Sequence, residues 1–196
     1  MTSPESLEES YFNDVYSRRD DPWDFETSDY ERKKYQATIG ALAKERYNNA
    51  FEIGCSIGVL SELLAARCHK LLSVDVSDLP LEKARLRLKD HAQVTVKKMT
   101  VPAEFPQTTF DLTVLSEVGY YWSLTDLHRA QQLITDHLQP EGQLLLVHWT
   151  PFVPDYPLTG DQVHDYFLAQ AAEKGTFKHL LKQREENYRL DLLERI

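Results

Sequence analysis

The chain has 196 residues, of which 42% are hydrophobic and 11% aromatic, a composition typical of one globular domain and not of a disordered segment. Its formal net charge of −9 argues against nucleic acid or an anionic membrane surface as a partner, because both attract cationic proteins. The sequence has two cysteines without a CxxC metal motif, no signal-peptide core and no apolar run of about 18 residues, so we expect a soluble cytoplasmic protein with free thiols and no metal.

Apolar residues recur at helical spacing over residues 5–17 and again over residues 30–47, which predicts two N-terminal helices. Pro22 ends the first helix, and the loop after it carries Trp23. Trp23 either covers an edge of the core or closes over a ligand and excludes water. Lys34 lies in a basic cluster on the second helix, which is either solvated surface or a partner for a ligand carboxylate.

A buried strand followed at once by glycine is predicted at residues 49–53. Gly54 and Gly58 frame a turn that leads into a helix, and such a turn presents backbone N–H groups to a small ligand. The next strand, residues 70–76, ends near Asp75, which lies 21 residues after Gly54. This is the spacing at which an acid commonly binds a ribose.

The remaining chain continues the alternation of strands and helices, which indicates an α/β fold. A final helix over residues 161–174 is followed by two strands joined by a tight turn, which add an antiparallel pair at one edge of the sheet. We therefore expect a Rossmann-like, mostly parallel sheet of seven strands with helices on both faces, in a single domain. Its three parts are the N-terminal lid and helices (1–48), a cofactor-binding core (49–149) with strands at 93–99, 110–116 and 143–149, and an acceptor-side helix with the strand pair (150–196).

The residues of the glycine turn disfavour a dinucleotide. Ser56 stands where a pyrophosphate-binding turn needs glycine, and its Cβ obstructs the approach of a diphosphate to the backbone. Glu52 adds a carboxylate to the same place. A ribose with a cationic neighbour fits better, because Asp75 can accept both hydrogen bonds of a diol and Glu52 suits an ammonium or a sulfonium. S-adenosylmethionine combines these groups.

These motifs resemble those of the class I S-adenosylmethionine-dependent methyltransferases and, more narrowly, of the nodulation protein S (NodS) family. The similarity rests on Glu52-x-Gly54-x-x-x-Gly58, on Asp75 and on the blocks DPWDF, FDLTVLSE, LSEVGYY and LLLVHW. It implies an enzyme that converts S-adenosylmethionine to S-adenosylhomocysteine and methylates a small-molecule or saccharide acceptor. The nodulation relatives methylate the free amino group of a chitooligosaccharide, so the resemblance implies N-methylation of an amino sugar.

The resemblance also implies roles for individual residues. Asp75 would hold the ribose, Trp23 would close over the cofactor, and Lys34 would pair with the cofactor carboxylate. Ser116 and Glu117, at the end of the fourth strand, would face the sulfonium side. Further cofactor contacts are expected at Gly54, Cys55, Ser56, Gly58, Val76, Thr100 and Val101.

Polar and aromatic residues after the fourth and fifth strands are the candidates for the acceptor side. Glu117 and His148 are candidate catalytic bases, because an amine must lose its proton before it attacks and an imidazole pKa of about 6.5 suits this step. His148 is equally well a structural histidine, and His164 and Asp161 are expected at the rim. An aromatic wall for a sugar ring or an alkylammonium is expected from Tyr120, Tyr121, Trp149 and Tyr156.

Three functions stay open on the sequence alone. The first is N-methylation of a small molecule or saccharide, and the second is O-methylation of a sugar or natural-product hydroxyl. The third is a non-catalytic subunit that binds S-adenosylmethionine and supports a partner. No Asn/Asp-Pro-Pro-Tyr motif follows the fourth strand, which argues against nucleobases as acceptors. The oligomeric state is open.

Overall fold

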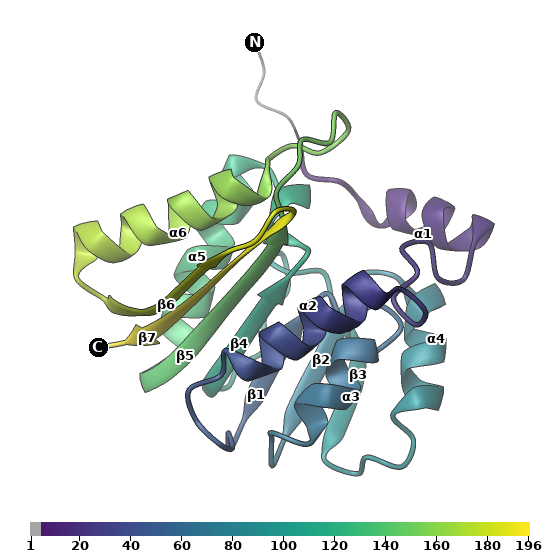
Figure 1. The fold of residues 1–196 in the computed structure, drawn as a ribbon, viewed down its shortest axis with the longest axis horizontal. Coiled ribbons are helices and arrows are strands. Elements are labelled where there is room, and N and C mark those ends of the chain that lie inside the picture. Colours follow the sequence, from purple (N-terminus) through teal and green to yellow (C-terminus); the bar gives the residue numbers. More distant parts are fainter. Residues whose placement is uncertain (1–4) are drawn as a thin grey trace. The chain divides into compact units, whose positions relative to one another are not determined.

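The computed structural model describes residues 5–196, which divide into two compact units. One unit spans residues 8–100, and the other spans residues 101–196 together with residues 5–7. Seven strands follow the order β3-β2-β1-β4-β5-β7-β6 in a mixed sheet, and Figure 1 labels its elements. The Rossmann-like fold predicted from the alternating pattern is confirmed.

Three parallel strands in the order β3-β2-β1 form the sheet of the 8–100 unit. The four residues of β1 are all buried, as the apolar run at this position predicts. Ser77 caps α4 by accepting a hydrogen bond from the N–H of Leu79, and Pro80 lies in the first turn, where no N–H is needed. The elements are α1 (Glu9–Arg18), α2 (Asp29–Gly40), β1 (Ala50–Ile53), α3 (Val59–Ala65), β2 (Leu71–Asp75), α4 (Asp78–Arg87) and β3 (Val94–Lys98).

The 101–196 unit contains the predicted antiparallel C-terminal pair. Strand β4 runs parallel to β5, and β7 runs antiparallel between β5 and β6. Every residue of β4 is buried, and α6 lies along β6 and β7 in Figure 1. The elements are β4 (Phe110–Ser116), the short 3-10 helix η1 (Gly119–Tyr121), α5 (Leu124–His137), β5 (Leu138–Trp149), α6 (Gly160–Lys174), β6 (Phe177–Arg184) and β7 (Tyr188–Arg195).

Two predicted element boundaries are wrong by five residues or more, and the first helix begins at Glu9 and not at residue 5. The helix expected to reach Tyr47 ends at Gly40, because the chain then turns and the N–H of Tyr47 donates to the carbonyl of Arg67 at 2.8 Å. The fifth strand begins at Leu138 and not at Gln143, since the Pro-Glu-Gly segment between them is an irregularity within the strand. In both places a contact distant in sequence overrides the local pattern.

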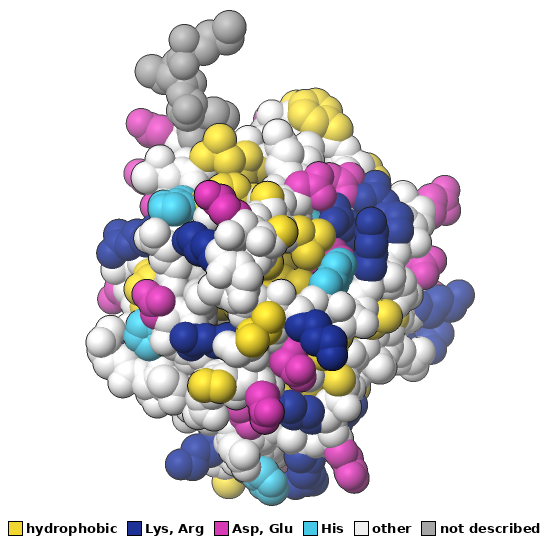
Figure 2. Space-filling view, turned by 90° about the vertical axis from the view of Figure 1, so that its left-hand side faces the viewer, with side chains coloured by type: hydrophobic (Ala, Val, Ile, Leu, Met, Phe, Trp, Pro, Cys, Tyr) yellow, Lys and Arg dark blue, Asp and Glu magenta, His cyan; other side chains and the backbone are white. Residues whose placement is uncertain are grey.

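Side chains of both charges are intermingled on the face drawn in Figure 2, so this face has no continuous basic surface of the kind that binds nucleic acid. Over residues 5–196, no helix is both long enough and apolar enough to cross a membrane. Both cysteines, Cys55 and Cys68, are buried free thiols, as predicted.

Candidate cofactor site and acceptor-side cluster

The glycine turn between β1 and α3 has left-handed backbone at three positions. The φ angles are 82° at Gly54, 50° at Ser56 and 80° at Gly58. Glycine adopts such angles at little cost, whereas Ser56 does so under strain. A Cβ on Gly58 would lie 3.1 Å from Cα and Cβ of Ala84 in α4, so glycine is also needed there for the close approach of the two helices.

Asp75, at the end of β2, lies directly beside this turn. Its Oδ2 accepts the N–H of Ser56 at 3.0 Å, and its Oδ1 accepts the N–H of Ser77 at 3.1 Å. Each carboxylate oxygen has a second lone pair, so both can also accept from a diol. Burial raises the pKa of Asp75 to about 6, while the backbone N–H groups act in the opposite sense. The structure therefore brings together the turn and the acid that the spacing had linked.

Glu52 lies in the interior behind the turn, with 1% of its surface exposed. Its Oε2 accepts hydrogen bonds from the hydroxyl groups of Ser61, at 2.5 Å, and of Ser73, at 2.7 Å. Burial raises the pKa of Glu52 to about 7, against the effect of the two serines, and the charge of Asp75 raises it further. The carboxyl group is thus held by α3 and β2.

Helix α1 adds two polar side chains to the turn, and the sequence reasoning missed both. The hydroxyl of Tyr16 lies 2.5 Å from that of Ser56, and the hydroxyl of Ser77 donates to Oδ1 of Asn13 at 2.6 Å. The available signal was their spacing of three residues, which places Asn13 and Tyr16 on one face of the predicted helix.

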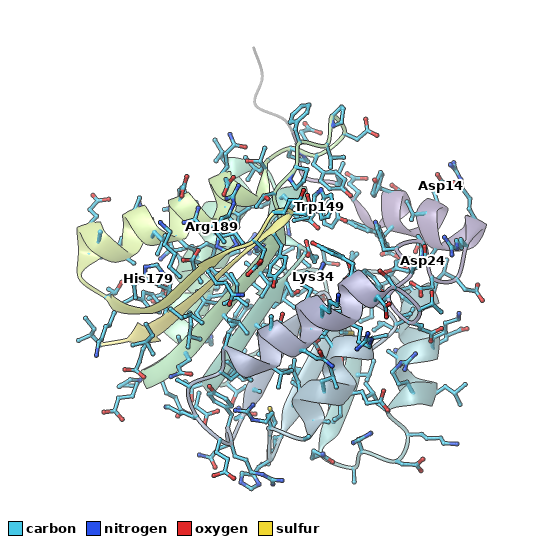
Figure 3. The ribbon with its side chains drawn as sticks, in the orientation of Figure 1. Asp14, Asp24, Lys34, Trp149, His179 and Arg189 are labelled. Atoms are coloured by element: carbon cyan, nitrogen blue, oxygen red, sulfur yellow. The ribbon has the colours of Figure 1, made fainter. Side chains whose placement is uncertain are left out.

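Trp23 and Lys34 contact neighbours within the 8–100 unit. The ring of Trp23 packs edge-on against that of Tyr16 at 5.5 Å, so it reaches the turn through this residue. Lys34, labelled in Figure 3, is 3% exposed; its Nζ lies 3.0 Å from the carboxylate of Glu31 and 5.3 Å from the ring centre of Tyr30. A ligand carboxylate at Lys34 would share this cation with Glu31.

The other predicted cofactor residues are divided between the two units. Cys55, Val76 and Thr100 belong to the 8–100 unit, and burial raises the pKa of the Cys55 thiol. Val101 and Ser116 belong to the 101–196 unit, and both are buried.

Glu117 follows β4 directly and has a φ of 58°, which a residue other than glycine holds only where its surroundings enforce it. Its N–H donates to the carbonyl of Val147 at 2.9 Å. Its Oε2 accepts the hydroxyl of Tyr120 at 2.7 Å and the N–H of Trp149 at 2.8 Å. The structure therefore brings together three of the predicted acceptor-side residues.

An aromatic cluster adjoins this carboxylate. Tyr120 stacks on Tyr156 with ring centres 5.0 Å apart, and Tyr121 meets each of them edge-on at 4.7 Å. Burial and the charge of Glu117 raise the pKa of Tyr120, so its hydroxyl stays protonated and donates to that carboxylate.

His148 is fully buried, and both of its ring nitrogens have partners. Nε2 accepts the N–H of Gly119 at 3.1 Å, and Nδ1 lies 3.0 Å from Nε2 of His164. His164, expected at the rim, is also fully buried, and its Nδ1 lies 2.6 Å from Oδ2 of Asp191. Of the two readings of His148 that the sequence left open, this geometry supports the structural one.

A family model described as Nodulation protein S (NodS) matches residues 13–149, more than half of the chain. The chain belongs to the nodulation protein S family. Curated proteins named Nodulation protein S from Rhizobium tropici and Bradyrhizobium diazoefficiens are 31% and 30% identical to it over 128 residues. The match covers 64% of this chain but 54% and 61% of those proteins, so it spans little more than half of their length.

Solved structures show the same fold. The N-methyltransferase NodS from Bradyrhizobium japonicum WM9, in complex with S-adenosylhomocysteine, has a TM-score of 0.82 at 20% identity, covering 95% of this chain and 97% of that one. A Pseudomonas syringae protein provisionally designated a methyltransferase has a TM-score of 0.73 at 39% identity, covering 85% and 99%.

Proposed function

We propose that this protein is an S-adenosylmethionine-dependent methyltransferase that methylates an amine of a small-molecule or saccharide acceptor and releases S-adenosylhomocysteine. The observation that carries the proposal is the glycine turn with its left-handed residues, set beside the buried carboxylate of Asp75. Membership of the nodulation protein S family supports it, as does the likeness to a methyltransferase structure that holds S-adenosylhomocysteine.

The residues around the turn fit this cofactor. Asp75 retains a lone pair on each oxygen for the two ribose hydroxyls. Ser56 stands where a pyrophosphate-binding turn has glycine, which disfavours a diphosphate. Lys34 is the cation for the cofactor carboxylate, and Trp23 excludes water. When bound, S-adenosylmethionine supplies an electrophilic methyl group on a sulfonium.

Glu117 is the residue that we assign to the acceptor amine. The amine must be neutral to attack, and a carboxylate at hydrogen-bond distance holds the ammonium form and takes up its proton. Tyr120 and the N–H of Trp149 orient this carboxylate through Oε2. The aromatic cluster beside it suits a sugar ring or a methylated ammonium.

Calorimetric titration with S-adenosylhomocysteine and S-adenosylmethionine tests the cofactor assignment. We expect saturable binding, and an absence of heat and of thermal stabilisation would refute the proposal. Turnover is then measured with deacetylated chitooligosaccharides, simple amines, sugars and phenols as acceptors. Methylated amines support N-methylation, whereas binding without turnover of any acceptor would favour a non-catalytic subunit.

O-methylation is the second candidate. A Ubiquinone biosynthesis O-methyltransferase from Nitrosomonas europaea is 38% identical over 66 residues, which are 33% of this chain. Methyl ethers from the phenols or sugars of the same panel, with unmodified amines, would favour this alternative.

A further inference from the structure

A chain of buried hydrogen bonds runs through the 101–196 unit from β7 to the turn after β4. Asp191 contacts His164 at 2.6 Å, and His164 contacts His148 at 3.0 Å. The N–H of Gly119 donates to Nε2 of His148 at 3.1 Å. The three side chains are 0% exposed, so bulk water does not compete for these bonds.

Only one arrangement of protons satisfies every link. A backbone N–H can only donate, so Nε2 of His148 is unprotonated and the proton of this ring lies on Nδ1. Nδ1–H of His148 therefore donates to Nε2 of His164. The proton of His164 then lies on Nδ1 and is donated to Asp191. Both imidazoles are neutral, and both are in the Nδ1–H form, which is the less common form of a neutral histidine.

Asp191 sets the direction in which protons are donated along this chain of hydrogen bonds. Its carboxylate also accepts Nε–H of Arg189 at 2.8 Å and Nε2–H of His179 at 2.7 Å. Figure 3 labels these two residues, which belong to β7 and β6. Burial alone would raise the pKa of Asp191, but the hydrogen bond from His164 and the charge of Arg189 outweigh it and lower the pKa. The carboxylate is thus an obligatory acceptor.

The other end of the chain holds the turn that carries Glu117. Three consecutive residues of β5 contact this turn: the carbonyl of Val147 and the N–H of Trp149 bond Glu117, and His148 between them bonds Gly119. A Cβ on Gly119 would lie 3.0 Å from Nε2 of His148, so the ring approaches as closely as glycine permits. The strained backbone of Glu117 depends on these contacts.

We propose that His148, His164 and Asp191 are positioning residues, which hold the turn after β4 and with it Glu117 in the geometry that meets the methyl acceptor. The role of Glu117 rests on the proposed function, whereas the chain itself rests on hydrogen bonds and burial. A shift of about 1 Å near the chemistry can cost about 100-fold in rate. A broken link therefore lowers kcat and leaves cofactor affinity nearly unchanged, because within residues 5–196 the glycine turn and Asp75, to which we assign the cofactor, have no hydrogen bond to this chain of residues.

A metal site is a poor alternative for these residues. Over the described part of the chain, no three His, Cys, Asp or Glu side chains converge so that they could hold an ion. The cluster is linear, and each of its links already contains one proton.

The protonation pattern is tested without any assumption about function. In protein labelled with ¹⁵N-histidine, long-range ¹⁵N–¹H correlations at pH 7.5 should show His148 and His164 in the Nδ1–H form. An Nε2–H form of His148 would refute the chain of hydrogen bonds from Asp191 to Gly119, even if the protein binds S-adenosylhomocysteine. Failure of that binding would instead refute the proposed function alone.

The coupling to Glu117 is tested by two substitutions of one residue. His164→Gln keeps an acceptor oxygen near the position of Nε2, whereas His164→Asn is too short to reach His148. With deacetylated chitotetraose as the acceptor, we expect kcat to fall at least 10-fold in His164→Asn and to remain within about 3-fold in His164→Gln. The Kd of S-adenosylhomocysteine should stay within 2-fold in both.

His128→Gln, at an exposed histidine of α5, is the control and should change neither quantity. Equal kcat values in the two His164 variants would overturn the positioning role. If chitotetraose is not methylated, the amide chemical shifts of Glu117 and Gly119 decide: they should move in His164→Asn and not in His164→Gln, and any other pattern overturns the proposal.

Discussion

Two carboxyl groups beside the glycine turn show how burial changes the chemistry of a residue. Asp75 and Glu52 are separated from water, and their pKa values rise to about 6 and about 7. An unbonded carboxylate at either position would cost much more, so backbone N–H groups bind the first and serine hydroxyls the second. Both groups therefore change charge near neutral pH.

Cofactor affinity should depend on the ionisation of Asp75. The ribose hydroxyls donate to the carboxylate, so binding favours the ionised form and weakens as the pH falls through about 6. We expect S-adenosylhomocysteine to bind about 10-fold more weakly at pH 5 than at pH 8 in calorimetric titrations. Asp75→Asn should bind weakly at both values; a pH dependence that survives in this variant would contradict the assignment.

Glu52 should make the folded protein less stable at high pH. Its pKa is raised to about 7 in the folded state, so the folded state retains a proton that the unfolded state releases, and stability is lost as the pH rises from about 4.5 through about 7. In urea denaturation, Glu52→Gln should gain on the order of 1–3 kcal/mol over the wild type between pH 5 and pH 8.

The matched control for this substitution is Glu62→Gln, at an exposed position on α3. Its difference from the wild type should stay constant with pH to about 0.5 kcal/mol. A constant difference for Glu52→Gln as well would show that Glu52 is ionised in the folded protein throughout this range.

At the scale of elements, close approach between helices decides where α3 begins. Gly58 combines a φ of 80° with a distance of 3.1 Å from its hypothetical Cβ to Ala84, so both its backbone and its surroundings demand glycine. Gly40 ends α2, and a Cβ there would meet no atom within 4 Å. The two glycines therefore lie in contrasting environments, so a substitution at Gly40 is a control for the same substitution at Gly58.

Gly58→Ala should lower the free energy of unfolding by about 1–3 kcal/mol, because it adds both backbone strain and a steric contact with α4. Gly40→Ala should be neutral or stabilise by up to about 1 kcal/mol, since alanine is the better helix former. Urea denaturation monitored by circular dichroism measures both values. Equal effects of the two substitutions would contradict the role assigned to the turn.

At the scale of the whole molecule, the C-terminal strands complete the sheet although they lie outside the family match, which ends at residue 149. Strand β7 pairs with β5 from Tyr188 to Glu194, and its residues from Tyr188 to Leu193 are buried. Its loss would leave β5 as an exposed apolar edge. This segment is therefore part of the core and not an appendage.

A chain that ends at Lys174 should fail to fold. It lacks β6 and β7, and with them the carboxylate of Asp191 that compensates the burial of His164. We expect aggregation, or a circular dichroism signal without a cooperative thermal transition, where the full chain shows one. A soluble truncated chain that unfolds cooperatively would contradict the prediction.

The sequence by itself determined the strands, the glycine turn and the position of Asp75. These features follow from local signals: apolar runs, glycines where the backbone turns left-handed, and an acid placed by the regular length of a strand-helix-strand unit. Local signals also explain the two largest boundary errors. They do not show that Tyr47 bonds Arg67 after the end of α2, or that Leu138 at the start of β5 pairs with Phe110.

Only the tertiary structure decided which polar side chains meet. His148 bonds His164, 16 residues away, and His164 bonds Asp191, 27 residues away, and no periodic pattern encodes either pair. The strained φ of Glu117 likewise results from the end of β5. Hydrogen bonds between buried groups depend on packing across several elements, so their partners, and with them the protonation state of each histidine, are decided only when the chain has folded.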